Sequence, residues 1–372
     1  MLIGVPKEIK NNEFRVGLTP QSVEEIIHHG HEVMVEANAG IGIAASDADY
    51  RAAGARVIAG AEEIFAKAEM IVKVKEPQAG ERAMLREGQI LFTYLHLAPD
   101  PEQTADLIKS RAVCIAYETV TSAQGGLPLL APMSEVAGRM AVQAGAHCLE
   151  RINGGRGMLI GGVPGVDPAK VVIIGGGVVG THAAHIALGM GGDTWVIDRS
   201  TEALKRLWSQ FGRPLDTVYS TRTSIAQHVR EADLVIGGVL IPGAAAPKLV
   251  TAEMIKGMKP GAVVVDVAID QGGCFETSHA TSHADPTYIV DDVVHYCVAN
   301  IPGAVPRTST YALNNVTLPF VLALAGKGYR QALEDDRHLL NGLNVHLGDV
   351  TYQQVATDLG LDYRDPLEAI RG

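Results

Sequence analysis

The chain of 372 residues is poor in several features that mark special classes of protein. It has no long uninterrupted apolar run, because the longest, residues 316–325, contains Pro319, and its N-terminus soon meets Pro6 and charged residues. We therefore predict neither a membrane span nor a signal peptide. Basic residues are outnumbered, with 31 Lys and Arg against 42 Asp and Glu, and the formal net charge of -11 gives no electrostatic support for nucleic-acid binding.

Cysteine is also scarce, and its few positions lack the close spacing of a metal-binding motif. The cysteines fall in apolar or strand-like surroundings, as reduced thiols in a protein core do. This pattern favours a reducing compartment, so we predict a cytoplasmic location. The four positions are Cys114, Cys148, Cys274 and Cys297.

Glycine and apolar residues, in contrast, are abundant. The sequence contains 41 glycines, and 47% of its residues are hydrophobic, a balance that fits an α/β enzyme. A length of 372 residues exceeds what one ordinary core accommodates, so we predict two domains, each able to bury a sizeable interior.

Short apolar runs alternate with helical stretches along most of the chain. Such alternation predicts parallel sheets covered by helices, and the runs fall into two series. We therefore expect an α/β fold with two Rossmann-like, doubly wound parallel-sheet domains linked by long helices. The first series comprises residues 2–5, 33–37, 70–75, 90–96 and 113–118, and the second comprises residues 171–174, 194–198, 232–238, 262–270 and 295–300.

The segment KVVIIGGGVVG, residues 170–180, carries the strongest single signal. A β-branched run leads into Gly175, Gly177 and Gly180, and a stretch of helical character follows. This spacing allows a tight turn, a close approach of the backbone to a pyrophosphate and close packing of helix on strand. Asp198 ends the next apolar run, where an acid binds ribose hydroxyls and repels a 2′-phosphate. The segment therefore predicts a dinucleotide site that prefers NAD.

The position of this fingerprint in the middle of the chain indicates how the domains are arranged. Residues 129–306 contain the second series of strands, and we assign them to an NAD-binding Rossmann domain. Residues 1–128 and 307–372 then form a substrate (catalytic) domain, with the NAD-binding domain inserted in it. Two helices, one over residues 134–151 and one beyond Pro306, are expected to bridge the domains.

Polar residues at strand ends are the candidates for chemistry, because ligands of open α/β sheets bind beyond the carboxyl ends of the strands. Two cations on one side, with a histidine and an aspartate, suit the oxidation of a small anion between two domains. The candidates are Arg15, Lys75, His96 and Glu118 in the first domain, and Asp270 and Asn300 in the second.

Each candidate also has a simpler structural explanation. Arg15 and Lys75 could be surface charges in loops, and His96 could be a structural histidine with satisfied hydrogen bonds. Asp270 could bond backbone amides in its glycine turn. Only their shared placement at strand ends favours a functional interpretation.

Other polar residues are open to the same doubt. Ser134 could serve only as a helix N-cap, and Asp198 could cap the next helix together with Ser200. Arg199 could soften the preference for NAD by meeting the phosphate of NADP. His279 and His283 lie in one long loop, but no acid or cysteine completes a metal-binding set with them.

Taken together, the motifs resemble those of the L-alanine dehydrogenase family, within the superfamily shared with the α-subunit of pyridine nucleotide transhydrogenases. The likeness covers nearly the whole chain, and the motifs are long and specific. They are GVPKEIKNNEFRVGLTP (4–20), IVKVKEP (71–77), TYLHLA around His96, the glycine fingerprint, DVAIDQGGCFETS (266–278) and VANIPGAVPRTST (298–310).

The resemblance implies reversible, NAD-dependent oxidative deamination of L-alanine to pyruvate and ammonia, through hydride transfer to nicotinamide and hydrolysis of an imine. It implies that Arg15 and Lys75 bind the substrate, that His96 and Asp270 are catalytic, and that the protein is a homohexamer. Along the NAD site it places Ser134, Asp198, Ser220, Val239, Leu240 and Asn300, with the fingerprint residues Gly175, Gly177, Val178, Val179 and Gly180.

The sequence departs from some relatives at one point and leaves other functions to be tested. Some relatives hold magnesium with an acid and a histidine in the helix after Pro306, where this chain has Ala323 and Lys327, so we predict no bound metal. The alternatives are a soluble NAD(H)-binding transhydrogenase subunit, a saccharopine dehydrogenase and a non-catalytic NAD-responsive regulator. Retention of the substrate-site candidates argues against the first and third, and the second needs a pocket for a much longer substrate.

Overall fold

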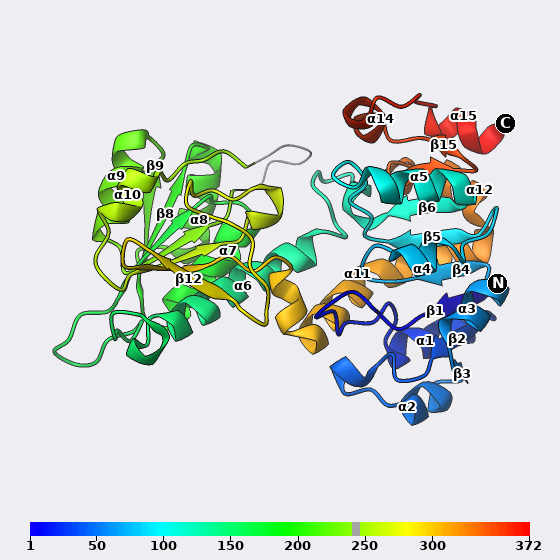
Figure 1. Cartoon of the computed structure of the whole chain (residues 1–372), viewed down its shortest axis with the longest axis horizontal. Coiled ribbons are helices and arrows are strands. Elements are labelled where there is room, and N and C mark those ends of the chain that lie inside the picture. The colour runs from blue at the N-terminus through cyan, green and yellow to red at the C-terminus, as the bar shows by residue number, and fades with distance from the viewer. Residues whose placement is uncertain (240–245) are drawn as a thin grey trace. The chain divides into compact units, whose positions relative to one another are not determined.

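The computed structural model describes residues 1–239 and 246–372, which form two compact units (Figure 1). Unit 1 comprises Met1–Met133 and Val305–Gly372, and unit 2 comprises Ser134–Ala304. The sequence predicted one domain of residues 129–306 and another of residues 1–128 and 307–372. These boundaries stay a prediction.

Unit 1 is built on an eight-stranded sheet. Six strands are parallel and follow the order β3-β2-β1-β4-β5-β6, which is a doubly wound arrangement. Two further strands from the C-terminal part of the chain extend the β6 edge, because β14 pairs antiparallel with β6 and β15 pairs antiparallel with β14. The strands are β1 (Leu2–Val5), β2 (Glu32–Glu36), β3 (Arg56–Ile58), β4 (Met70–Val72), β5 (Ile90–Thr93), β6 (Val113–Ala116), β14 (Leu343–His346) and β15 (Asp349–Val350).

Several helices of unit 1 begin at side-chain caps. Thr19, for example, accepts a hydrogen bond from the backbone N–H of Ser22, and a proline occupies the first position of the helix that follows. The helices are α1 (Pro20–His28), α2 (Asp47–Ala52), α3 (Ala61–Lys67), α4 (Ala79–Arg82), α5 (Pro101–Ser110), α11 (Pro306–Lys327), α12 (Tyr329–Asp335), α13 (Arg337–Leu340), α14 (Gln353–Leu359) and α15 (Pro366–Arg371).

Unit 2 is built on a seven-stranded sheet in which six parallel strands follow the order β9-β8-β7-β10-β11-β13, and antiparallel β12 lies at the edge. The strands are β7 (Lys170–Ile174), β8 (Asp193–Asp198), β9 (Leu215–Tyr219), β10 (Leu234–Gly237), β11 (Val263–Asp266), β12 (Thr287–Val290) and β13 (Val293–Tyr296). The helices are α6 (Ala131–Cys148), whose first turn belongs to the end of unit 1, α7 (Val178–Gly189), α8 (Thr201–Phe211), α9 (Arg222–Glu231) and α10 (Ala252–Lys256).

Both sheets are covered by apolar side chains on both faces. In β7, alternate residues belong to two different core clusters, with Val171 and Ile173 in one and Val172 and Ile174 in the other. The strands of unit 1 alternate between two clusters in the same way. Because successive side chains of a strand point to opposite faces, this pattern explains why the strands are continuous apolar runs in the sequence.

The structure confirms the predicted fold class of two doubly wound α/β sheets, and it corrects some details. The strands β3, β9, β12, β14 and β15 were not predicted. Ser134 is the fourth residue of α6, so it is not the N-cap of that helix. Ser200 is the N-cap of α8, where it accepts a hydrogen bond from the N–H of Ala203.

The longest helix, α11, contains Pro319 in its interior. Because proline has no N–H, the helical hydrogen bond at that position is missing. No helix within residues 1–239 and 246–372 combines the length and the apolar character that crossing a membrane requires.

Candidate functional site

Each parallel sheet has one point at which its strand order reverses. In unit 1 this point lies between β1 and β4, and in unit 2 it lies between β7 and β10. Ligands of doubly wound sheets bind beyond the strand ends at such a point. The loops that follow these four strands and their neighbours carry most of the predicted site residues.

In unit 2 the loop after β7 is the glycine fingerprint. Gly175 has a φ of 104°, which only glycine adopts easily, and its N–H donates to the carbonyl oxygen of Ile197 at 2.8 Å. A Cβ on Gly180 would overlap the carbonyl oxygen of Gly175, so helix and loop can pack closely only with glycine there. A Cβ on Gly177, in contrast, would meet nothing within 4 Å.

The N-terminus of α7 is open to an anion. Gly177 precedes the helix without a side-chain cap, and Val178 and Val179 are its first two residues. The first N–H groups of a helix lack helical partners and attract negative charge. These N–H groups, together with the open space at Gly177, fit the pyrophosphate of a dinucleotide.

Asp198 connects the end of β8 to the glycine loop. Its Oδ2 accepts from the N–H of Gly176 at 2.5 Å, and its Oδ1 accepts from the N–H of Ser200 at 2.7 Å. The N–H of Ser220, just beyond β9, donates to the backbone oxygen of Asp198 at 2.9 Å. Each carboxylate oxygen has a second lone pair, so Asp198 can still accept hydrogen bonds from ribose hydroxyls.

The other predicted residues of unit 2 lie beyond neighbouring strands. Val239 follows β10, and Leu240 lies outside the described residues. Asp270 is exposed in a short 3-10 helix after β11. Asn300, after β13, has a φ of 65°, and its carbonyl oxygen accepts from the N–H of Gly303 at 2.9 Å and lies 3.1 Å from Nε2 of His283.

The loop that carries Asp270 is organised by a buried carboxylate, Asp266. Its Oδ2 accepts from the N–H of Cys274 at 2.9 Å and from Oγ of Ser278 at 2.6 Å, and its Oδ1 accepts from the N–H of Ala268 at 3.2 Å. Burial raises the pKa of Asp266, and these hydrogen bonds oppose the rise.

In unit 1, Arg15 is a buried residue with 2% of its surface exposed. Its Nε and Nη2 donate to the two carboxylate oxygens of Glu13 at 2.7 and 2.5 Å, and its Nη1 lies 3.1 Å from Sδ of Met133. Burial alone would lower the pKa of Arg15, but the Glu13 carboxylate raises it, so the guanidinium stays charged. The interpretation of Arg15 as a surface charge is therefore wrong.

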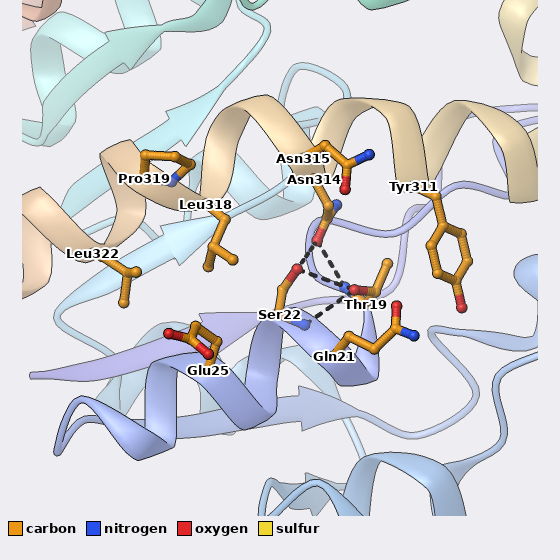
Figure 2. Close-up of a pocket in the computed structure, with 10 residues that line it drawn as sticks. All are labelled: Thr19, Gln21, Ser22, Glu25, Tyr311, Asn314, Asn315, Leu318, Pro319 and Leu322. Carbon is orange, nitrogen blue, oxygen red and sulfur yellow. Dashed lines mark hydrogen bonds between the residues drawn. The ribbon is translucent and has the colours of Figure 1, made fainter.

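Helix α11 holds the loop that carries Arg15. The side chain of Asn314 accepts from the N–H of Thr19 at 2.8 Å and donates to the carbonyl oxygen of Gly17 at 3.1 Å. Figure 2 shows Asn314 facing Thr19 and Ser22 on the wall of a pocket between α1 and α11. This pocket has a volume of about 390 Å³, and no predicted site residue is among those that line it.

Lys75 follows β4 in a segment fixed by buried charges. Oε1 of Glu8 accepts from the N–H of Val74 at 2.7 Å and from the N–H of Lys75 at 3.3 Å. Oε2 of Glu8 pairs with Nζ of Lys73 at 3.0 Å, and Glu81 pairs with the same Nζ at 2.7 Å. Burial would lower the pKa of Lys73, but the two carboxylates outweigh that effect and raise it. Burial also raises the pKa of Glu8, against the opposing charge of Lys73.

His96 lies in the turn after β5, with 46% of its side chain exposed. Its ring is stacked on that of Tyr94, with centroids 5.9 Å apart and planes 6° from parallel. Burial raises the pKa of Tyr94, and the nearby charge of Arg15 opposes the rise. Tyr94 therefore has two predicted residues, Arg15 and His96, as neighbours.

Several residues of these sites were not assigned a function from the sequence. Glu8 and Glu13 precede Arg15 in one charged motif, and acids so close to a candidate cation were an available signal. Tyr94 precedes His96 by two positions, the spacing at which strand residues share a face. The partners of Lys73 are Glu8, in the loop after β1, and Glu81, in α4, so no local pattern joined them.

No group of three or more His, Cys, Asp or Glu side chains that could hold a metal ion occurs in the part of the chain that the structure describes. Lys327 Nζ, at the end of α11, pairs with Asp335 Oδ2 at 2.6 Å. The absence of a bound metal stays a prediction.

Two doubly wound units, one with a glycine fingerprint and an acid on the next strand, define a dinucleotide-binding protein of two α/β units. Comparison with known proteins narrows this class. Family models for the N-terminal and C-terminal domains of "Alanine dehydrogenase/PNT" match residues 4–137 and 141–353. The chain belongs to this family.

Relatives and solved structures agree. The chain is 60% identical to the alanine dehydrogenase of Halomonas elongata, over 98% of both chains, and 56% identical to that of Methanococcus maripaludis, over 100% of both. A solved structure of an L-alanine dehydrogenase superposes with a TM-score of 0.94 at 52% identity, covering 97% of this chain and 99% of that one. A transhydrogenase from Sinorhizobium meliloti gives 0.81 at 27% identity, covering 95% and 99%.

Proposed function

We propose that this protein catalyses the reversible, NAD-dependent oxidative deamination of L-alanine to pyruvate and ammonia. The observation that carries the proposal is one chain holding a dinucleotide loop in unit 2 and a buried, oriented guanidinium, Arg15, at the reversal point of unit 1. Full-length relatives named alanine dehydrogenase, 56% and 60% identical to this chain, support the same function.

The residues of unit 2 hold the cofactor in this proposal. When bound, NAD supplies the acceptor for the substrate hydride. The amides of Gly177, Val178 and Val179 bind the pyrophosphate, and Asp198 accepts from the ribose hydroxyls. We assign supporting contacts along the same site to Ser134, Gly175, Gly180, Ser220, Val239, Leu240 and Asn300.

Cofactor preference follows from Asp198. Because its carboxylate would face the extra phosphate of NADP, we expect NAD to be used far more efficiently than NADP. Measured kcat/KM values for the two cofactors test this expectation. Comparable values would show that Arg199 neutralises the repulsion.

The residues of unit 1 bind and orient the substrate. Arg15 binds the alanine carboxylate through its guanidinium, whose plane is fixed by the hydrogen bonds to Glu13. Lys75 supplies a compact positive charge near the carboxylate or the developing carbonyl oxygen. Orientation of the alanine Cα toward the hydride acceptor is the main contribution of these two side chains to the rate.

His96 and Asp270 transfer protons during hydrolysis of the imine in this proposal. Loss of the hydride leaves an imine, and water must add to it and lose a proton before ammonia leaves. Imidazole suits this exchange because an ordinary histidine titrates near neutral pH. We assign Asp270 to the same proton exchange.

One assay tests the proposed function. NADH formation is followed with a panel of L-amino acids, and NADH consumption is followed with pyruvate plus ammonium. We expect alanine to be the preferred amino acid and the reaction to run in both directions. No activity in either direction would overturn the proposal and would favour a transhydrogenase subunit or a non-catalytic NAD-responsive regulator.

We further propose that the protein assembles as a homohexamer. Large apolar side chains of unit 2 are exposed, an arrangement typical of an interaction surface. Light scattering coupled to gel filtration gives the mass, and a monomer at assay concentration would contradict the proposal. The exposed side chains are Ile152, Leu159, Val163, Val166 and Ile289.

A cytoplasmic location is proposed from the cysteines. All four are buried free thiols, and burial raises the pKa of Cys114 and of Cys274 to about 12, which leaves them unreactive. Proteins that fold in an oxidising compartment more often pair their cysteines. Cell fractionation followed by immunodetection tests the location.

A further inference from the structure

We propose that Glu118 is a positioning residue for His96, and that its carboxylate holds the turn after β5 in the conformation that presents the imidazole. The inference rests on the proposed function, because it takes His96 as the residue that exchanges protons with the substrate. It gives a role to a strand-end acid that the sequence marked as a candidate without assigning it one.

Glu118 reaches His96 from the neighbouring strand. It lies in a short 3-10 helix, Tyr117–Thr119, directly after β6, and β6 pairs with β5 in parallel register. Oε1 of Glu118 accepts from the N–H of His96 at 2.6 Å, and both carboxylate oxygens lie 3.2 Å from the N–H of Leu95. One side chain therefore satisfies two successive amides of the turn.

The backbone of His96 needs such support. Its φ is 51°, a left-handed conformation that residues other than glycine adopt at a cost. Two side chains of α5 also bind the turn. Nε2 of Gln103 donates to the carbonyl oxygen of Leu95 at 2.7 Å, and Oγ1 of Thr104 donates to that of Leu97 at 3.0 Å. Strained conformations persist where surrounding contacts fix them in this way.

The same carboxylate faces the imidazole. Oε1 of Glu118 lies 3.9 Å from Nδ1 of His96, while the ring of Tyr94 is stacked on the imidazole. Only 12% of the Glu118 side chain is exposed, against 46% for His96, so the acid lies on the inner side and the imidazole on the outer side. Acid, backbone and stacked ring thus leave the imidazole little freedom to turn.

The alternative is that Glu118 only stabilises the fold, and a double-mutant cycle separates the two roles. The four proteins are wild type, Glu118→Ala, His96→Ala and the double variant, each assayed for pyruvate amination with NADH and ammonium. If Glu118 acts through His96, removing Glu118 should lower the rate only while His96 is present. A purely structural residue would lower the rate by the same factor in both backgrounds.

We expect Glu118→Ala to lower kcat by about 10- to 100-fold, with the KM for pyruvate and the Kd for NADH within about 3-fold of wild type. In the His96→Ala background the same change should lower kcat by less than about 2-fold. Equal factors in the two backgrounds would overturn the positioning role.

Two further variants complete the experiment. Glu118→Gln keeps an oxygen that can accept from the His96 amide, so it should recover most of the lost kcat, and a loss as large as that of Glu118→Ala would contradict the amide-based mechanism. Glu87→Ala removes an exposed acid of unit 1 that pairs with Arg111, and should leave kcat unchanged. A wild-type protein with no activity toward alanine or pyruvate would refute the proposed function itself. An active wild type in which Glu118→Ala lowers kcat by the same factor with and without His96 would refute only the role of Glu118.

Discussion

The reversal points of the two sheets have the same topology and opposite chemistry. In unit 1 the loops after β1 and β4 bring buried side-chain charges together, among them Arg15 with Glu13 and Lys73 with Glu8. In unit 2 the loop after β7 presents backbone N–H groups and glycine, and an acid from the next strand binds that backbone. The strand order thus determines where a ligand can bind, and the loop residues determine which ligand is bound.

The buried charges of unit 1 and the glycine loop of unit 2 differ in what destabilises them. A buried charge is costly unless a partner of opposite sign and good hydrogen bonds compensate for its lost hydration. A glycine loop has no such cost, but it depends on the absence of side chains at a few positions. Substitutions that remove a charge partner or add a methyl group therefore test the comparison directly.

The largest effect is expected from Lys73→Met. Without this ammonium, Glu8 and Glu81 are left as buried carboxylates without their shared cation, which should lower the free energy of unfolding by about 3–5 kcal/mol. Urea denaturation measures the change. The control is Lys67→Met, which removes an exposed pair with Glu63 and should cost no more than about 1 kcal/mol. Equal losses would mean that burial of the charges has no special importance.

Next comes His96→Ala, which separates chemistry in unit 1 from cofactor binding in unit 2. Turnover should fall by about 100-fold or more, equivalent to about 2.7 kcal/mol, while the Kd for NADH stays within about 3-fold. Steady-state kinetics and NADH fluorescence titration give the two quantities. Near-normal turnover would remove His96 from the mechanism.

A smaller effect is expected from Gly177→Ala, which tests the backbone site of unit 2. Because the added Cβ meets no atom of the chain within 4 Å, folding should be unaffected, and any loss reports contact with the cofactor alone. We expect the Kd for NADH to rise on the order of 10-fold, or about 1.4 kcal/mol. Gly189→Ala, later in α7 and also unobstructed, should leave it unchanged. Unaltered affinity in both variants would contradict the assigned pyrophosphate position.

The smallest effect concerns β14, a strand by which the two sheets differ. Burial, helped by the charge of Arg330, lowers the pKa of His346 to about 4. Between about pH 6.5 and 4, His346 is therefore protonated in the unfolded chain but not in the folded one. The free energy of unfolding thus decreases as pH falls through this range. Across this range the Tm of wild type should fall further than that of His346→Gln, with similar kcat. Parallel Tm curves would show that His346 makes no contribution.

Much of the fold was predictable because both sheets are buried on both faces. Each of the ten predicted apolar runs coincides with a strand, since such strands must be apolar throughout. Five runs extended two or more residues beyond their strands, to Lys75, His96, Glu118, Asp270 and Asn300, because the chain stays largely apolar for a few residues after pairing ends. Among the strands that were not predicted, β3, β9 and β12 lie at sheet edges, where their residues are only partly buried, whereas β14 is buried throughout.

The candidate site was predictable only in part. A motif such as the glycine fingerprint is local, so its residues, spacing and acid could be identified from one segment. The surroundings of Arg15 and His96 depend instead on residues of other elements, such as Asn314 of α11 and Glu118 of the 3-10 helix after β6, that no periodic pattern connects to them. The left-handed backbone of His96 had no sequence signal either, because such conformations are usually marked by glycine.

The pairing of β14 with β6 has a consequence for biosynthesis. Residues of unit 2 form one continuous stretch of chain, so its sheet needs no strand from a later part of the chain. Unit 1 is different, because Val345 of β14 pairs with Cys114 of β6, and its sheet stays unfinished until the last part of the chain has been synthesised. The half-made protein therefore exposes the β6 edge, a strand edge able to pair with other chains, for as long as translation of unit 2 takes.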